Sequence, residues 1–235
     1  MLLNLFVLVA GYLLGSIPSG WLAGHWLAGL DLRQEGSGST GATNVLRVLG
    51  KGPALAVFVV DVLKGSLAVL LAKTLLQPIG YDAGSDWWVV AAGLAALAGH
   101  IWPLWLGWKG GKAVATGLGM LLGLTWPVGL ACFGIFLAML TFSRIVSFSS
   151  VVAALALPAL MLAWFGDSGL RPAYLLLAVL TTVLVVWRHR SNLQRLLAGQ
   201  EPRLGAAKAA ADKAATDKAA AAIADANENG NAHKN

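Results

Sequence analysis

Residues 114–142 read VATGLGMLLGLTWPVGLACFGIFLAMLTF, and the division of this stretch decides how many times the chain crosses a membrane. The stretch is too long for a single span of about 20 residues and too short for two spans of that length. Thr125-Trp126-Pro127 lies near its middle, and proline disfavours helical backbone at the residue before it. The pattern predicts two shorter helices with a turn between them; one tilted helix is the alternative.

The whole chain has the composition of an integral membrane protein. Of its 235 residues, 57% are hydrophobic and 12% are charged, whereas soluble domains contain about 25% charged residues. The first apolar run has no basic segment before it and no Ala-x-Ala cleavage site, so we expect a retained helix and no signal peptide. The single cysteine, Cys132, excludes a disulfide framework and a cysteine-rich metal site.

The remaining apolar runs are each long enough for one span. They lie at about residues 3–25, 53–76, 87–106, 150–165 and 172–187. The fold class is therefore an all-α polytopic bundle of about seven transmembrane helices, or six if residues 114–142 form one helix. We expect residues 1–204 to form one transmembrane domain. Residues 205–235 are an Ala/Lys/Asp-rich low-complexity tail, which we expect to be disordered or a frayed helix on the cytoplasmic side.

The distribution of basic residues predicts the orientation. With seven spans and the N-terminus outside, ten Lys and Arg residues fall on the cytoplasmic side, and only Arg171 and Lys73 fall on the outer side. The ten are Arg33, Arg47, Lys51, Lys109, Lys112, Arg144, Arg188, Arg190, Arg195 and Arg203. Six spans would move His189 and Asn192 to the opposite face from the other polar motifs, which favours seven. The net charge of +6 is accounted for by topology, with no nucleic-acid partner.

The first polar motif is residues 36–51, GSGSTGATNVLRVLGK. Its glycines allow positive φ and close approach to a ligand, successive N–H groups can cradle an anion, and an arginine can hold a phosphate with two parallel hydrogen bonds. A P-loop is excluded, because no Lys-Ser/Thr pair follows the second glycine. A flexible polar connection is the alternative. The residues of the predicted cradle are Gly36, Ser37, Gly38, Gly41, Thr43, Asn44 and Arg47.

A second motif of the same kind follows the third predicted span. Lys109 and Lys112 flank Gly110-Gly111 at the start of a predicted helix, whose N-terminal N–H groups and dipole favour an anion. An ordinary basic anchor at the membrane edge is the alternative. Two such loops on one membrane face favour anion binding for both.

Further polar groups interrupt the apolar spans. Asp61 and Lys64 are one helical turn apart inside the second span, where they are either a site or a structural ion pair. Gly15 to Gly20, GSIPSG, breaks the first helix at a depth where irregular backbone must face protein or a wet cavity; a packing kink is the equal alternative. His25 is interpreted as a residue of the membrane interface. His100 is either an interface residue or a functional one.

The end of the last span carries another polar cluster. His189 and Asn192 are spaced i,i+3, which predicts one helix face, among Arg188, Arg190 and Arg195. The patch Ser143 to Ser147 adds Arg144 and a hydroxyl on the same predicted side of the membrane. Together these motifs predict chemistry that joins a phosphate compound to a lipid. They do not choose between acyl transfer, phosphoryl transfer and transport.

Three stretches resemble a known family. GSIPSG, GSGSTGATNVLR and GHIWPLWLGWKGGKAVAT are similar, in order and spacing, to the signature motifs of the bacterial acyl-phosphate:glycerol-3-phosphate acyltransferases, the PlsY family. DVLKG from Asp61, the SRIVS patch and HRSNLQRLLAGQE extend the resemblance over residues 3–201. The chain has Ser39, Ala113 and Ile145 where the family usually has Asn, Gly and Tyr.

The resemblance implies transfer of a fatty acyl group from acyl phosphate to the 1-hydroxyl of sn-glycerol 3-phosphate, giving lysophosphatidic acid and phosphate. It implies no cofactor and no metal, and a bacterial cytoplasmic membrane with the active site facing the cytoplasm. Expected partners are acyl phosphate, glycerol 3-phosphate, membrane lipids and, through the family alone, the soluble enzyme that makes acyl phosphate. No H-x4-D sequence occurs, which argues against the acyl-CoA-dependent acyltransferases.

Our mechanistic hypothesis is direct attack without an acyl-enzyme. The expected catalytic residues are Ser37, Arg47, Ser147, His189 and Asn192. Gly36, Gly38, Gly41, Thr43 and Asn44 are expected to bind acyl phosphate, and Lys109, Gly110, Gly111, Lys112 and Arg144 to bind glycerol 3-phosphate. Either His189 or the substrate's own phosphate accepts the proton. The alternative function is transport of an organic phosphate, which the one-sided motifs and the lack of a visible repeat disfavour.

Overall fold

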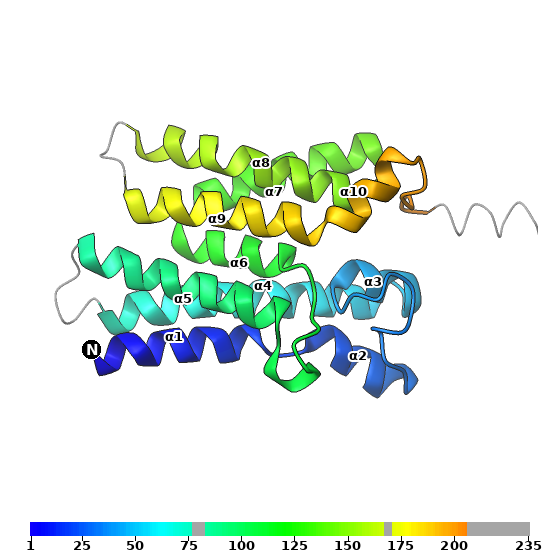
Figure 1. Ribbon diagram of the computed structural model, residues 1–235, viewed down its shortest axis with the longest axis horizontal. Coiled ribbons are helices and arrows are strands. Elements are labelled where there is room, and N and C mark those ends of the chain that lie inside the picture. The colour runs from blue at the N-terminus through cyan, green and yellow to red at the C-terminus, as the bar shows by residue number, and fades with distance from the viewer. Residues whose placement is uncertain (77–82, 167–170, 206–235) are drawn as a thin grey trace, which may run out of the picture.

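The computed structural model describes residues 1–76, 83–166 and 171–205, and the regular elements in these ranges are helices. Figure 1 shows most of them running side by side along one axis. They are α1 (Leu2–Gly15), α2 (Ser19–Ala28), α3 (Ala42–Val48), α4 (Lys51–Leu76), α5 (Ala83–Ile101), the 3-10 turn η2 (Leu104–Leu106), α6 (Val114–Leu124), α7 (Trp126–Ser143), α8 (Val146–Phe165), α9 (Pro172–Arg188) and α10 (Arg190–Leu197).

The predicted break in residues 114–142 is confirmed. Helix α6 ends at Leu124 and α7 begins at Trp126, and Thr125 between them has extended backbone with φ −153°. Pro127 occupies the first turn of α7, where its missing N–H would have no helical acceptor in any case. Proline therefore starts the second helix and leaves the first one short.

The helices are those of a polytopic membrane protein. Within the described residues, five segments are long and apolar enough to cross a membrane: Leu2–Ala28, α4, Gly84–Leu106, α7 and α8. A sixth is the pair α9 and α10, which bends by 57°. Helix α6 is apolar but has only 11 residues, so the seven-span count stays a prediction that rests on α6.

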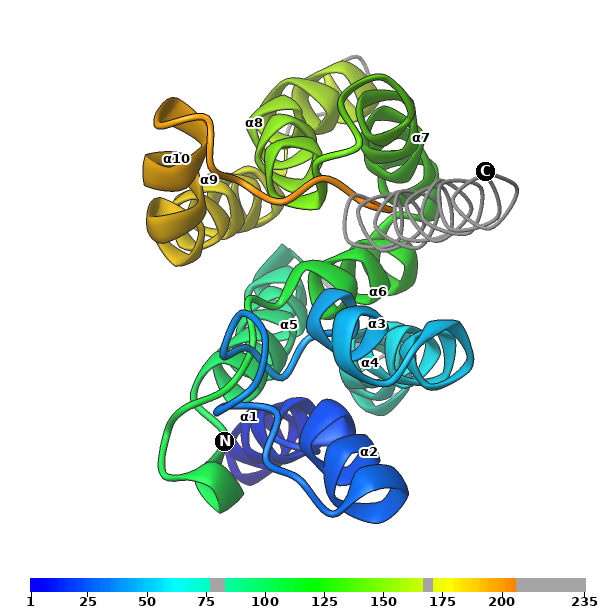
Figure 2. The same cartoon turned by 90° about the vertical axis from the view of Figure 1, so that its right-hand side faces the viewer.

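The helices form two groups, seen end-on in Figure 2. One group contains α1, α4, α5 and α6, and the other contains α7, α8 and α9. The groups meet where α6 packs against α7 and where α5 packs against α9. One hydrophobic core extends across both groups, and it includes Leu97, Met120, Leu157 and Leu177.

Glycines allow α4 and α6 to pack with their backbones close together. A Cβ atom on Gly119 of α6 would lie 1.8 Å from the carbonyl oxygen of Val62, and one on Gly65 of α4 would lie 2.1 Å from that of Thr116. Close approach through small residues is the usual way that membrane helices associate, because lipid supplies no hydrophobic driving force between them.

We expect Gly119→Ala to lower the free energy of unfolding by about 2 kcal/mol or more, because the new methyl group must push α4 and α6 apart. Thermal unfolding of the purified protein in detergent measures this change. The matched control is Gly134→Ala in α7, where a Cβ atom would meet nothing within 4 Å. Equal melting temperatures for the two variants would contradict this packing.

The structure differs from the sequence-based prediction in three places. The polar segment 31–52, predicted to be a loop, contains a helix, α3. Helices α5 and α8 begin about four residues earlier than predicted, at Ala83 and Val146. The last helix ends at Arg188, and Asn192 belongs to a separate helix. The prediction for the tail falls on residues 206–235, which lie outside the described residues.

Candidate active site

A cavity of about 120 Å³ lies between the two groups of helices, at the end of the bundle that carries α3 and α10 (Figure 1). It brings together motifs that are far apart in the sequence. The predicted site residues that line it are Ser37, Gly41, Thr43, Asn44, Arg47, Lys112, Ser147, His189 and Asn192. Asp61, His100 and Glu201 line it as well.

Asn44 organises the first motif. Its buried Nδ2 group donates to the carbonyl oxygens of Leu32, Glu35 and Ser39 at 2.9 to 3.0 Å, and its Oδ1 accepts from the backbone N–H of Ser37 at 2.8 Å. The amide is therefore used by the protein itself. We had expected Asn44 to contact acyl phosphate, whereas its contacts here shape the loop that surrounds the cavity.

The glycines of this motif have different roles. Gly36 and Gly38 have φ of 57° and 68°, as expected for glycine. A Cβ atom on Gly36 would also lie 2.4 Å from Oδ1 of Asn44. Gly41 has φ −79° and is the N-cap of α3, so it does not use the positive φ that glycine allows. Gly36 and Gly38 are exposed and shape the turn without lining the cavity.

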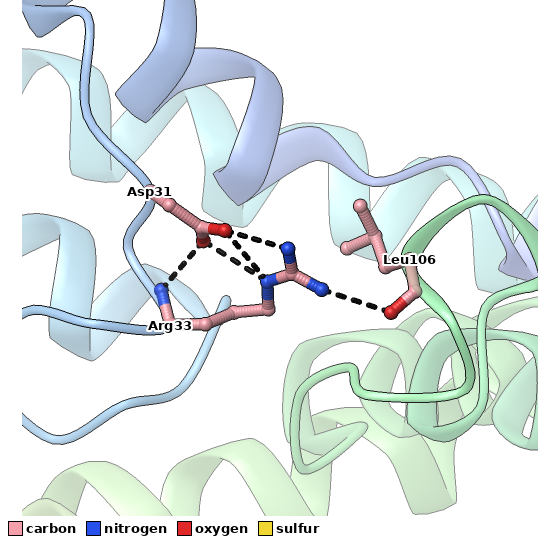
Figure 3. A network of polar contacts seen from close by, with 3 residues as sticks. All are labelled: Asp31, Arg33 and Leu106. Carbon is pink, nitrogen blue, oxygen red and sulfur yellow. Dashed lines mark hydrogen bonds and ion pairs between the residues drawn. The ribbon is translucent and has the colours of Figure 1, made fainter.

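An arginine connects the first and second motifs (Figure 3). The guanidinium of Arg33 donates to both carboxylate oxygens of Asp31 at 2.6 to 3.0 Å, and its Nη1 donates to the carbonyl oxygen of Leu106 at 2.9 Å. The hydrogen bonds from Arg33 lower the pKa of Asp31. The link holds the segment before the first motif against the turn that precedes the second.

The second motif is held by backbone contacts. The N–H of Gly110 donates to Ile101, and that of Gly111 donates to His100, both at 3.1 Å. Nη2 of Arg188 donates to the carbonyl oxygen of Gly111 at 2.9 Å. The glycines thus support the wall of the cavity, and Lys112, which follows them, lines it.

The two lysines of this motif are separated by the fold. Lys112 is partly buried and lines the cavity, whereas Lys109 is exposed and does not line it. Arg144 is also exposed, and it caps α7 with φ 57° outside the cavity. The structure therefore brings one of the three expected phosphate-binding cations to the cavity and leaves the other two outside it.

Lys112 begins a chain of polar contacts along the cavity. Its Nζ donates to Oδ1 of Asn192, and Nδ2 of Asn192 donates to Oε1 of Glu201 at 2.6 Å. The same Oε1 accepts from Oγ of Ser147 at 2.7 Å, and Oε2 accepts from Nε of Arg195 at 2.9 Å. One carboxylate therefore orients the hydroxyl and the amide that sequence analysis singled out.

The cavity shifts the titration of both charged groups. The pKa of Lys112 is lowered to about 8, with burial as the largest cause; Glu201 opposes this shift, and the nearby arginines add to it. Burial alone would raise the pKa of Glu201, but hydrogen bonds from Asn192, Ser147 and Arg195 outweigh it and lower the pKa. Glu201 is therefore a carboxylate at neutral pH, and Lys112 remains charged up to about pH 8.

His189 sits at the bend between α9 and α10. Its side chain is 3% exposed, and Nδ1 lies 2.8 Å from the carbonyl oxygen of Val185. A carbonyl oxygen only accepts hydrogen bonds, so Nδ1 carries the proton, and in the neutral ring Nε2 has the free lone pair. The bend places Asn192 in the first turn of α10 and still brings both residues to the same cavity.

An apolar cavity continues from the polar one. The two share the lining residues Phe58, Ala113, Val114, Ala115, Phe136 and Ser150. The apolar part is otherwise lined by α6, α7, α8 and α9, and it includes Leu118, Leu121, Phe133 and Leu157. A polar head and a long apolar chain of one molecule therefore have adjoining places in this fold.

Comparison with known proteins identifies the family. Residues 5–199 match the family model described as glycerol-3-phosphate acyltransferase. The chain belongs to the glycerol-3-phosphate acyltransferase family. The membership predicted from three short motifs is confirmed, and the protein is accordingly an acyltransferase enzyme that acts on glycerol 3-phosphate.

Relatives of this glycerol-3-phosphate acyltransferase are similar over nearly their whole length. The glycerol-3-phosphate acyltransferase of Prochlorococcus marinus (strain MIT 9313) is 71% identical over 203 residues, covering 86% of this chain and 95% of that protein. The enzyme of Synechococcus sp. (strain CC9902) is 65% identical, covering 87% of this chain and 97% of that protein.

Crystal structures of PlsY, an integral membrane glycerol 3-phosphate acyltransferase, have the same fold. The glycerol 3-phosphate form has a TM-score of 0.77 and 37% identity, covering 88% of this chain and 98% of that one. The lysophosphatidic acid form has a TM-score of 0.73 and 37% identity, covering 86% and 95%.

One charged residue that lines the cavity of this acyltransferase was not predicted as a site residue. Glu201 lies beyond the last span and was quoted only as the final letter of HRSNLQRLLAGQE. It is 8% exposed and accepts hydrogen bonds from three side chains. The available signal was a lone acidic residue after the basic end of the last helix.

Proposed function

We propose that this enzyme takes its acyl group from acyl phosphate and transfers it to the 1-hydroxyl of sn-glycerol 3-phosphate, giving lysophosphatidic acid and phosphate. The observation that carries the proposal is the polar cavity, which holds Arg47 and Lys112 and shares its lining with an apolar cavity. A long-chain acyl phosphate has this chemistry, because its anionic head is joined directly to a hydrocarbon chain.

In this proposal the first motif holds the head of acyl phosphate. Ser37, Thr43 and Arg47 of this motif line the cavity. A bidentate arginine stabilises the charge that the departing phosphate gains in the transition state. Asn44 contributes by fixing the loop, and Gly36 and Gly38 by allowing its turn.

In the same proposal, a second set of cavity residues binds glycerol 3-phosphate. Lys112 is the cation for its phosphate, and Ser147 and Asn192 orient its glycerol hydroxyls. Both of these polar groups are already aligned by Glu201. Holding two anionic substrates in attack geometry supplies much of the rate, and the attack is direct, with no acyl-enzyme.

The proton of the attacking hydroxyl has two acceptors in this scheme. Nε2 of His189 has the free lone pair, and the phosphate of glycerol 3-phosphate is the other acceptor. We expect His189→Ala to lower kcat by about 100-fold or more if His189 is the base. Near-normal turnover of this variant in purified protein would assign the step to the substrate's phosphate.

The proposed setting is the bacterial cytoplasmic membrane, with the N-terminus outside and the cavity facing the cytoplasm. The basic residues Arg33, Arg47, Lys109, Lys112 and Arg190 all belong to segments at the cavity's end of the bundle, which supports this orientation. Both anionic substrates would then arrive from the cytoplasm, acyl phosphate from the soluble enzyme that forms it.

Release of phosphate by the detergent-purified protein tests the proposed donor. We expect release from palmitoyl phosphate that depends on glycerol 3-phosphate, that is absent with palmitoyl-CoA, and that falls by about 100-fold in Arg47→Ala. Acyl transfer from palmitoyl-CoA with no reaction of palmitoyl phosphate would overturn the donor assignment. Saturable uptake of glycerol 3-phosphate into proteoliposomes without acyl transfer would instead favour transport.

The titration of Lys112 predicts a pH dependence of substrate binding. Because the pKa of this lysine is about 8, its charged form predominates below that pH and is lost above it. We expect KM for glycerol 3-phosphate to rise above pH 8, by up to about tenfold per pH unit, since binding must then restore one proton. Steady-state kinetics from pH 6.5 to 9.5 measure this.

The control for this pH profile is Lys112→Arg. Arginine stays protonated throughout this pH range. We therefore expect KM of the variant for glycerol 3-phosphate to stay constant above pH 8, whatever its value at pH 7. A rise in KM of the same slope in Lys112→Arg would assign the titration to another group.

A further inference from the structure

A buried ion pair lies beside the cavity, which one of its two members, Asp61, lines. Asp61 and Lys64 of α4 are 1% and 3% exposed, and Nζ lies 2.8 Å from Oδ1. The same Nζ donates to the carbonyl oxygen of Ile17 at 3.1 Å, in the break between α1 and α2. Replacing such a pair with packed apolar residues is often neutral or stabilising, so stability alone does not explain its presence beside an active site.

The pair connects several helices through one carboxylate oxygen. Oδ1 of Asp61 accepts from Oγ of Ser19 in α2 at 2.6 Å and lies 3.7 Å from Nδ1 of His100 in α5. Oγ1 of Thr116 in α6 lies 3.2 Å from the same Nδ1. The Nδ1 edge of the imidazole therefore contacts the hydroxyl of Thr116 on α6 and faces the carboxylate of Asp61 on α4.

The other edge of His100 supports the second motif. A Cβ atom on Gly111 would lie 2.1 Å from Nε2 of His100, so the ring is packed directly against the backbone of Gly111. The N–H of Gly111 also donates to the carbonyl oxygen of His100. Lys112 follows immediately, so the position of the ring bears on where Lys112 enters the cavity.

We propose that Asp61 is a positioning residue for glycerol 3-phosphate, which acts through His100 and Gly111 on Lys112. Lys64 compensates the buried charge of Asp61, and Ser19 and Thr116 fix the orientation of the carboxylate and the ring. The inference rests on the proposed role of Lys112 as the ligand of the substrate's phosphate. It answers whether Asp61 and Lys64 form a site or a purely structural pair: they form the support of the acceptor site.

The test compares the two substrates in purified Asp61→Asn. Asparagine keeps the shape but removes the charge that pairs with Lys64 and faces Nδ1 of His100. We expect KM for glycerol 3-phosphate to rise about tenfold, with KM for palmitoyl phosphate changed by less than about twofold. Thr116→Val removes only the hydroxyl next to His100, and we expect it to raise KM for glycerol 3-phosphate selectively, by about threefold. This variant tests the inference if Asp61→Asn does not fold.

A double variant shows whether the effect passes through Lys112. In a Lys112→Ala background, Asp61→Asn is expected to raise KM for glycerol 3-phosphate by less than about twofold further, because coupled residues are not additive. Additive effects, or equal changes in KM for both substrates, would overturn the inference. An Asp61→Asn variant with an unchanged KM for glycerol 3-phosphate and a lower melting temperature would also overturn the inference.

Asp86→Asn is the matched control. Asp86 is 7% exposed and pairs with Arg171 at 3.1 Å, near the start of α5, about 21 Å along the helix from His100. It is expected to lower the melting temperature without changing either KM. The proposed function is tested separately, by wild type and by Lys112→Ala. It would be contradicted if wild type did not use palmitoyl phosphate, or if Lys112→Ala did not raise KM for glycerol 3-phosphate.

Discussion

Replacing Lys112 by alanine is expected to raise KM for glycerol 3-phosphate by about 100-fold, because removing one partner of a buried charge interaction costs about 3 kcal/mol. Lys112 is the lysine that lines the cavity, where it donates to Asn192 and lies among Arg47, Arg188 and Arg195. With the lysine removed, the substrate's phosphate enters a low-dielectric site without its cation. Steady-state kinetics at saturating palmitoyl phosphate, in detergent at pH 7, measure the change.

Lys109→Ala is the matched control for this prediction. The two lysines are three residues apart and flank the same pair of glycines, but Lys109 is exposed outside the cavity. We expect its KM to change by less than about threefold, the range of a solvent-screened charge. Comparable losses in the two variants would contradict the assignment of the phosphate to Lys112.

Replacing Glu201 by alanine is expected to lower kcat/KM by about 100-fold and to lower the melting temperature. The change leaves the buried donors of Ser147 and Asn192 without their acceptor, and each unsatisfied group costs about 1–3 kcal/mol. It also frees Arg195, whose Nε otherwise donates to Oε2 at 2.9 Å. Ser147 and Asn192 then lose the orientation that the attacking substrate requires.

Glu201→Gln separates the hydrogen bonds from the charge. A glutamine has one acceptor oxygen, so it serves either the Ser147 and Asn192 side or the Arg195 side, and we expect an intermediate loss of about tenfold. Glu35→Gln, on an exposed side chain of the first loop, is expected to behave like wild type. Full activity of Glu201→Ala would show that the cavity orients its substrates without this carboxylate.

Some features of the active site follow from the sequence and others do not. Ser37, Arg47, Lys112, Ser147, His189 and Asn192 were all predicted from motifs, and the fold brings all of them to one cavity. The contacts of Asn44 within its own loop, and the positions of Lys109 and Arg144 outside the cavity, were not predictable in the same way. A side-chain amide in a glycine-rich loop suits a ligand and a loop backbone equally well, and only the observed contacts to Leu32, Glu35 and Ser39 distinguish them.

By itself the sequence determined the class of the protein, the approximate positions of its apolar helices, the break at Thr125 and the family. These depend on local properties, namely hydropathy over about 20 residues, the backbone restriction before proline and the order of short motifs. Tertiary structure alone decided which lysine enters the cavity, that Glu201 joins it from beyond the last span, and that His100 packs against Gly111. Those facts depend on how helices distant in the chain pack together, which no local pattern specifies.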